Sequence, residues 1–164
     1  MARAARGSKR KDIHERALGL LTVRARSRRE LERRLLQAGF GTDEVDEELR
    51  RLEDVGLIDD ESFARQLAEQ AFGPGAKGRR AVASALFAKG IEPRLASSTL
   101  DEFGGDENVR ALELARTRVM RLAALEPQKA YQRLSGFLMR RGYGPEVAHS
   151  AARKALAVEH AEGR

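Results

Sequence analysis

The fold is decided by the stretch RRELERRLLQAGFGTDEV, Arg28–Val45, because recognisable versions of it return twice along the chain. In the first copy Leu31 and Leu35 stand eight and four residues before Gly39, and the apolar Phe40 follows that glycine. The same frame recurs in two later copies, as Val82, Leu86, Gly90 and Ile91, and as Leu134, Leu138, Gly142 and Tyr143. Successive turn glycines are 51 and 52 residues apart, so the chain contains a threefold repeat of nearly constant period.

Each copy predicts a helix with an apolar stripe at i and i+4, ended by a glycine in the left-handed conformation. A second helix begins after each turn, near Thr42, Pro93 or Pro145. A further helix precedes the first copy, with Ile13 and Ala17 on its inner face. We therefore expect an all-α protein built from three tandem three-helix, helix-turn-helix-like repeats in an elongated arrangement.

The predicted division is a disordered basic arm over 1–11, followed by repeat 1 over 12–58, repeat 2 over 59–104 and repeat 3 over 105–164. The arm, MARAARGSKRK, has five Lys or Arg side chains and no acid, which favours disorder. Within repeat 1, Ser27 opens the second helix and Glu30 completes a capping box, while Thr42 is expected to cap the third helix.

The first two repeats are joined by GLIDDESFA, residues 56–64. Gly56 ends a helix, and Leu57 and Ile58 are expected to plug the seam between repeats like a hydrophobic staple. Asp59 or Asp60 caps the next helix, and Phe63 continues its inward face. The predicted structural positions are thus these junction residues and the turn glycines Gly39, Gly90 and Gly142.

Composition narrows the classes of function. The chain has 164 residues, no cysteine, a formal net charge of +6 and a pI of about 10.1. The absence of cysteine excludes disulfides, thiolate nucleophiles and thiolate metal sites. No apolar run is long enough to cross a bilayer, and no hydrophobic region follows the basic N-terminus, so we expect a cytoplasmic protein without a membrane partner. The positive charge favours a polyanion or an acidic protein surface.

A search for catalytic or metal sites returns little. His14, His149 and His160 are scattered, and none stands at metal-ligand spacing from another. The acidic triplet Asp59–Glu61 lacks the alternating ligands of a calcium loop and is explained by helix capping. The linker GPGAKG, residues 73–78, lacks the Lys-Ser/Thr of a phosphate loop. We expect no catalytic residue, no metal and no cofactor.

The basic residues are more informative. Arg29 and Arg33 lie about 200 degrees around the helix from Leu31 and Leu35, so they face away from the core. Each arginine alone can be read as a solvated side chain or as an intrahelical partner of a glutamate. As a feature that recurs on the matched helices, they predict a surface for a partner or for DNA. Its members are Arg26, Arg28, Arg29, Arg33, Lys77, Arg79, Arg80, Lys89, Lys129, Arg133, Arg140 and Arg141.

Three stretches give the chain a resemblance to the RecX family of bacterial regulatory proteins: RSRRELERRL, residues 26–35, GLIDDESFA, residues 56–64, and KGRRAVASALFAKGI, residues 77–91. The resemblance implies a curved, elongated stack of three-helix repeats that binds the RecA recombinase and its nucleoprotein filament. It also implies inhibition of ATP hydrolysis, strand exchange and co-protease activity, by occupying the filament groove or capping growth. The chain departs from the family in its glycine-rich linker GPGAKG and in Gln132, which replaces a basic residue.

An alternative is a free-standing helix-turn-helix protein that binds single- or double-stranded DNA. Sequence-specific readout needs base-contacting side chains on one exposed recognition helix. The helix after each turn is instead acidic in the first repeat and rich in alanine or serine in the others. We therefore favour a monomeric, non-enzymatic regulator of RecA.

Overall fold

The computed structural model describes residues 4–74 and 76–162, with side chains described for 13–74 and 76–157. All regular elements of this described part are helices. Repeat 1 comprises α1 (Ala4–Val23), α2 (Arg28–Gln37) and α3 (Thr42–Asp54). Repeat 2 comprises α4 (Asp60–Phe72), α5 (Arg79–Ala88) and α6 (Pro93–Phe103). Repeat 3 comprises α7 (Glu107–Val119), the short 3₁₀ helix η1 (Met120–Leu122), α8 (Pro127–Arg140) and α9 (Pro145–Glu162).

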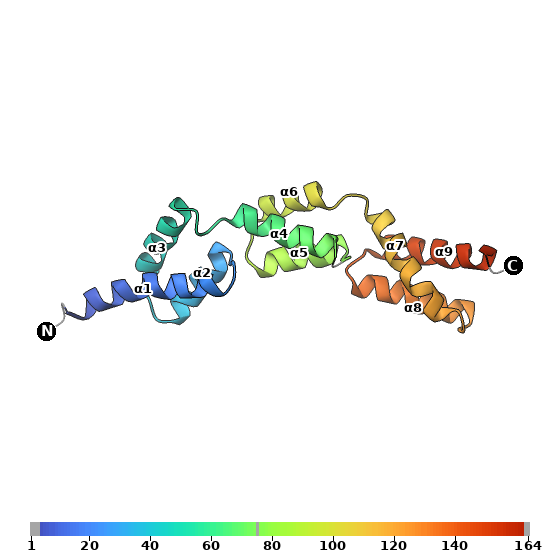
Figure 1. Cartoon of the computed structure of the whole chain (residues 1–164), viewed down its shortest axis with the longest axis horizontal. Helices are drawn as coiled ribbons and strands as arrows, with labels where there is room; N and C mark the ends of the chain where they lie inside the picture. The colour runs from blue at the N-terminus through green and yellow to red at the C-terminus, as the bar shows by residue number, and fades with distance from the viewer. Residues whose placement is uncertain (1–3, 75, 163–164) are drawn as a thin grey trace.

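The repeats follow one another along an elongated arch, with α1 and α9 at opposite tips (Figure 1). The prediction of an all-α repeat architecture is confirmed. Because each repeat contacts only its neighbours in such a stack, the seams between repeats determine the curvature of the arch.

Each repeat has its own small core, and the frame residues lie at its centre. Leu31 and Leu35 are buried in repeat 1, together with Ile13 and Ala17 from α1 and Leu49 from α3. The equivalent buried pairs in the later repeats are Val82 with Leu86 and Leu134 with Leu138. In each of the three repeats, the apolar pair at i and i+4 on the middle helix thus lies in a core made mainly of Leu, Ala and Val.

The turn glycines are equivalent in conformation. Gly39, Gly90 and Gly142 have φ values of 91°, 73° and 92°, in the left-handed region that favours glycine. In each turn the N–H of the following residue donates to a carbonyl five positions back, as Phe40 does to Leu35 at 3.3 Å. This bond satisfies a carbonyl that the helix end would otherwise leave unpaired.

Some helix starts follow the sequence and others depart from it. Ser27 Oγ accepts the N–H of Glu30 at 3.1 Å, and Asp59 Oδ1 accepts the N–H of Ser62 at 3.0 Å. Thr42 is instead the first residue of α3, which has Gly41 as its N-cap and no side-chain cap.

The seam plug also differs from expectation. Both Leu57 and Ile58 were expected to be buried between the repeats. Ile58 is buried in the core of repeat 1, whereas Leu57 is half exposed. Gly56, with φ of 72°, turns the chain at this point. Phe63 packs against the core of repeat 2 as expected from its position on α4.

The first helix starts earlier than expected. We predicted a disordered arm over 1–11, but α1 begins at Ala4, so residues 4–11 belong to a helix. Ala, Arg and Lys all have high helix propensity, which offsets the lack of apolar side chains in this segment. The remaining part of the predicted arm, residues 1–3, lies outside the described residues.

Candidate binding surface

The surface is positioned by seams that repeat the same contact. At the first seam the start of α2 meets the turn of repeat 2, where Ser27 Oγ donates to the carbonyl of Lys89 and the N–H of Arg28 donates to Asp60 Oδ1 at 2.7 Å. At the second seam the start of α5 meets the turn of repeat 3, and the N–H of Gly78 donates to the carbonyl of Arg141 at 2.9 Å.

The second seam also contains a hydrogen bond from a backbone N–H to a carboxylate, like that between Arg28 and Asp60 at the first seam. The N–H of Arg79 donates to Glu107 Oε1 at 2.8 Å, as Arg28 does to Asp60 at the first seam. Asp60 and Glu107 are the first residues of α4 and α7. The leading acids of repeats 2 and 3 therefore cap the middle helices of repeats 1 and 2. Burial, opposed by the Arg28 hydrogen bond, raises the pKa of Asp60.

The start of α8 differs from its counterparts. Helices α2 and α5 are each 10 residues long, whereas α8 has 14 residues and begins with Pro127. Proline has no backbone N–H, so α8 lacks at its first position the donor that Arg28 and Arg79 provide.

Two glycines allow the backbones of repeats 2 and 3 to touch. A Cβ on Gly78 would lie 2.3 Å from the Gly142 carbonyl, and a Cβ on Gly142 would lie 2.3 Å from the Cβ of Ala81. At the first seam the equivalent Gly90 packs on the side chain of Arg29, with the built Cβ 2.6 Å from Arg29 Cδ. Both seams are thus close contacts that leave little freedom for one repeat to move against the next.

Tyr143 is the largest side chain buried near the second seam. It is 1% exposed, and its hydroxyl donates to the carbonyl of Ala76 at 3.1 Å. Burial raises the pKa of this phenol. Beside it, the Arg110 guanidinium of repeat 3 lies 4.7 Å from the ring centroid of Phe72 in repeat 2, a cation–π contact across the seam.

We expect Tyr143→Phe to loosen the second seam. Loss of the hydroxyl leaves the Ala76 carbonyl without this donor, at a cost of about 1 kcal/mol. Trypsin cleavage after the exposed Lys77 should then accelerate by about fivefold if it proceeds through local opening. Tyr131→Phe is the control, because that hydroxyl bonds His149 within repeat 3, 2.8 Å away. An unchanged rate for Tyr143→Phe would show that the hydroxyl does not hold the seam.

The first seam contains a buried charged cluster. Glu30 and Arg26 are 5% and 8% exposed, and Arg26 Nη1 lies 2.7 Å from Glu30 Oε1. Arg24 pairs with the same carboxylate, and Lys89 Nζ reaches it from repeat 2 at 3.6 Å. Burial alone would raise the pKa of Glu30, but the Arg24 hydrogen bond and the three nearby cations lower it below its ordinary value.

Several residues expected at the binding surface also make contacts within the scaffold or are partly buried. Arg26 is buried against Glu30 and also donates to the carbonyl of Leu20 at 3.0 Å. Arg28 pairs with Glu53 at 3.0 Å, and Arg79 pairs with Asp101 at 2.5 Å. Lys89 reaches Glu30 at the first seam, and Arg141 is half buried. Sequence reasoning placed these cations on the helices but could not identify the partners that other elements bring to them.

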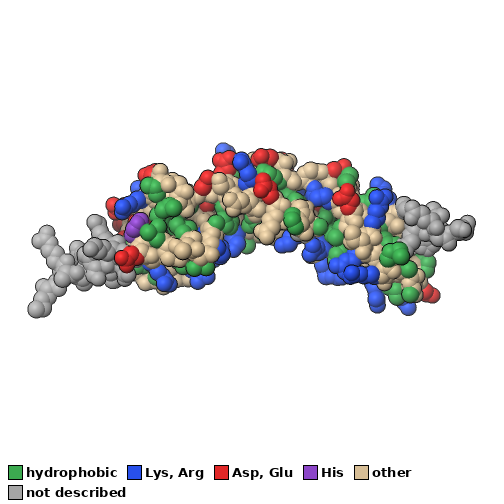
Figure 2. All heavy atoms as spheres, viewed as in Figure 1, with side chains coloured by type: hydrophobic (Ala, Val, Ile, Leu, Met, Phe, Trp, Pro, Cys, Tyr) green, Lys and Arg blue, Asp and Glu red, His purple; other side chains and the backbone are tan. Residues whose placement is uncertain are grey.

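The remaining predicted residues are exposed. They are Arg29, Arg33, Lys77, Arg80, Lys129, Arg133 and Arg140. Figure 2 shows Lys and Arg side chains gathered along the concave lower edge of the arch, and most Asp and Glu side chains of that face along the convex upper edge. The concave edge of this face of the arch is therefore predominantly positive (Figure 2).

Exposed apolar side chains accompany the basic ones. Leu36, Phe87 and Met139 each stand three residues before a turn glycine, and they are 38%, 54% and 39% exposed. Sequence reasoning did not assign these three positions to the surface. Their common place in the repeat, next to a buried i, i+4 stripe but outside it, was the available signal.

The described residues hold no group of three or more His, Cys, Asp or Glu side chains arranged to bind a metal ion. Among the helices of the same described part, none is both long and apolar enough to cross a membrane. The surface therefore consists of basic and apolar side chains on a helical scaffold.

Comparison with known proteins places these features in a family. Residues 14–52 match the model of the first three-helix domain of RecX, and residues 106–152 match that of the third. The chain is similar to a regulatory protein RecX of Mycobacterium sp. (strain KMS), with 38% identity over 163 residues, covering 96% of this chain and 88% of the relative. It is also similar to the regulatory protein RecX of Mycolicibacterium smegmatis, with 39% identity over 152 residues, covering 90% and 81%.

Solved structures agree on the fold. The crystal structure of RecX from Lactobacillus salivarius superposes with a TM-score of 0.77 at 20% identity, covering 91% of this chain and 97% of that one. A second crystal structure of a regulatory protein RecX gives a TM-score of 0.73 at 21% identity, covering 87% and 71%.

Proposed function

Because this chain belongs to the RecX family of regulatory proteins, we propose that it binds the RecA recombinase and its nucleoprotein filament and inhibits them without catalysing a reaction. Inhibition covers ATP hydrolysis, strand exchange and co-protease activity. On this proposal the protein acts in the cytoplasm, as a monomer and without a cofactor.

The observation that carries the proposal is the arch with exposed basic residues along its concave edge (Figure 2). Arg29 and Arg33 on α2 and Arg80 on α5 are all exposed on the middle helices of successive repeats. An elongated arch whose repeats are held together closely can contact several subunits of a helical filament at once. Several weak contacts made by one molecule together give a higher overall affinity than any one of them. The mechanism is steric: the bound arch occupies the filament groove or blocks addition of subunits.

The charge of the concave edge makes the interaction dependent on salt. Exposed cations steer association with an acidic surface and lose strength as ionic strength rises. Direct contact with DNA phosphates is the second candidate, since exposed Lys129, Arg133 and Arg140 lie on α8. That reading predicts tight binding to DNA without RecA and a steep salt dependence.

Charge reversal of Arg29, Arg33 and Arg80 to Glu should raise the protein concentration needed for half-inhibition of RecA ATPase on single-stranded DNA by about tenfold, which corresponds to about 1.4 kcal/mol. The three side chains lie outside the cores, so helical content by circular dichroism should not change, and small-angle X-ray scattering checks that the first seam, where Arg29 packs on Gly90, keeps its shape. The assay is a titration of RecA ATPase with the wild-type and variant proteins.

A matched control reverses Arg50 on α3, Arg94 on α6 and Arg116 on α7, three exposed arginines on other helices. Each triple reversal takes the formal net charge from +6 to 0. Equal loss of inhibition in both variants would indicate general electrostatics, and undiminished inhibition by the first variant would exclude its three arginines from the contact. Absence of inhibition by the wild-type protein, with tight DNA binding in its place, would favour the second candidate.

A further inference from the structure

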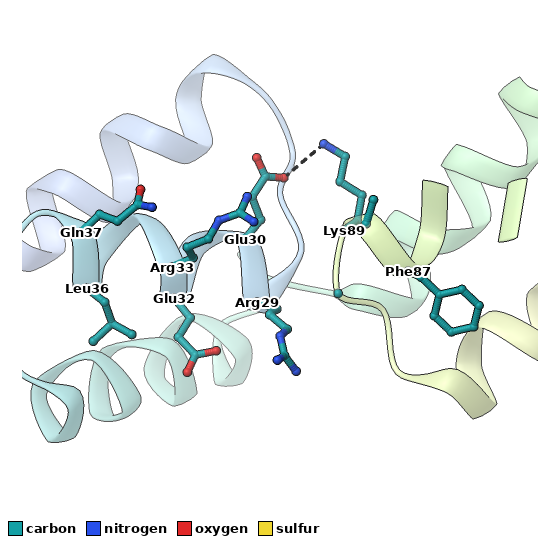
Figure 3. A pocket seen from close by; sticks show the side chains of 10 residues that line it. Arg29, Glu30, Glu32, Arg33, Leu36, Gln37, Phe87 and Lys89 are labelled. Carbon is teal, nitrogen blue, oxygen red and sulfur yellow. Dashed lines mark ion pairs between the residues drawn. The ribbon is translucent and has the colours of Figure 1, made fainter. Parts of the chain in front are cut away.

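A groove opens at the first seam, between α2 and the end of α5. Its volume is about 480 Å³, and it is bordered on one side by α2 and on the other by residues 87–90. Figure 3 shows Arg29, Glu32 and Leu36 projecting from the same side of α2, with Phe87 and Lys89 coming from the α5 side. The groove thus lies where two repeats meet.

The α2 wall is a continuous helix face. Arg29, Glu32, Arg33, Leu36 and Gln37 follow the spacing i, i+3, i+4, i+7 and i+8, so they share one face of the helix. The buried residues of α2 point to the core, which leaves this face to the groove. Helix faces of this kind commonly receive a segment of another protein.

Apolar side chains stand on both sides of the groove. Leu36 on α2 is 38% exposed, and Phe87 on α5 is 54% exposed. Figure 3 shows Leu36 and Phe87 at opposite ends of the lining with Arg29 and Arg33 between them, so the patch is apolar at its ends and charged in the middle. Such a patch is typical of a protein interaction site, where a partner side chain removes the apolar surface from water.

Of the charged groups that line the groove, Arg29, Arg33 and Glu32 make no ion pair within the described residues, so the unpaired charge is net positive. The carboxylate of Glu30 is already paired with Arg24, Arg26 and Lys89.

The groove discriminates between two polyanions. The guanidinium groups of Arg29 and Arg33 can each donate two hydrogen bonds to a carboxylate or to a phosphate, so the other lining residues decide between the two. Glu30 and Glu32 also line the groove. A nucleic acid would bring a uniform row of phosphates toward these glutamates, whereas a polypeptide can place neutral residues opposite them.

We propose that this groove receives an acidic segment of the partner protein, whose carboxylates meet Arg29 and Arg33 while apolar side chains of the segment cover Leu36 at one end of the groove and Phe87 at the other. The inference rests on the proposed function, because the partner filament supplies the segment. It goes beyond the proposed function because it names the groove that binds the segment and the side chains that the segment must carry.

The experiment uses the full chain with photoreactive p-benzoylphenylalanine at position 87, irradiated in complex with the RecA filament on single-stranded DNA. Val109 is the matched control position, because it is 51% exposed but lies on α7 in repeat 3. Mass spectrometry of the cross-linked product should identify a RecA peptide rich in Asp and Glu around an apolar residue, from position 87 and not from position 109. A cross-link to DNA, to a segment without acidic residues, or to nothing would overturn the proposal.

Binding measurements with truncated side chains complete the test. Phe87→Ala and Leu36→Ala should each weaken binding to the filament by about tenfold, whereas Val109→Ala should leave it unchanged. Equal affinity of Phe87→Ala and wild type would overturn the groove assignment. Failure of the wild-type chain to bind the filament at all would instead overturn the proposed function, and the groove assignment with it.

Discussion

Gly142→Ala should destabilise the protein by about 2–5 kcal/mol, because two separate penalties fall on one methyl group. Gly142 has φ of 92°, where an L-residue with a Cβ is strained by about 1–2 kcal/mol. The new Cβ would also lie 2.6 Å from the backbone nitrogen of Ala81, and forced repacking of this kind costs about 1–3 kcal/mol. The backbone of repeat 2 would have to move away from repeat 3.

Gly39→Ala separates the two penalties. Gly39 has nearly the same φ, 91°, but a Cβ there would meet no atom within 4 Å. Its cost should therefore be the strain alone, about 1–2 kcal/mol. Urea unfolding followed by circular dichroism measures both, and small-angle X-ray scattering should show a changed shape for Gly142→Ala only. Equal destabilisation by the two variants would mean that the second seam yields without cost.

Glu30→Gln is the second large effect, with an expected loss of about 3 kcal/mol at neutral pH. The substitution keeps the shape of the side chain but removes its charge, which leaves Arg26 buried without a counterion. Removing one member of a buried ion pair typically costs about 3–5 kcal/mol, and the retained amide hydrogen bond keeps the loss near the lower end. Glu32→Gln is the control, with an expected change below about 0.5 kcal/mol.

The dependence of the free energy of unfolding on pH tests the Arg26–Glu30 ion pair independently. The pKa of Glu30 in the folded protein is lowered from an ordinary value of 4.5, so its stabilising effect is fully present above about pH 4.5. It is lost as the pH falls through the lowered native pKa. The stability difference between wild type and Glu30→Gln should therefore be constant at higher pH and shrink below pH 4.5. A difference that stays constant into the acid range would contradict the ion pair.

How far the sequence predicts the structure depends on the range of each interaction. The stripe of Leu31 and Leu35 and the turn at Gly39 are local patterns, so three repeats of helices could be predicted from them. The contact of Arg28 with Asp60 joins residues 32 apart, and that of Arg79 with Glu107 joins residues 28 apart. Such pairs depend on how one repeat stacks on the next, which no local spacing encodes.

The residues of the candidate surface could likewise be predicted only where their position follows from local helical geometry. Helical geometry correctly predicts that Arg29 and Arg33 point outward, because that follows from the position of the core stripe. It fails for Arg26, which precedes α2 and folds inward to Glu30 and to a carbonyl of α1. The groove beside Phe87 could not be predicted, since it exists only where two repeats meet. The binding role of the exposed cations stays a prediction.

The missing N–H of Pro127 sets the start of α8 apart from the starts of α2 and α5. Each seam is made by a middle helix whose first N–H reaches the leading acid of the following repeat, and α8 has no such hydrogen to offer. The seam bond that Arg28 and Arg79 make therefore has no counterpart at the first residue of α8. On the proposed function, the distance between the contacts that one molecule makes with its partner is fixed by its two close seams.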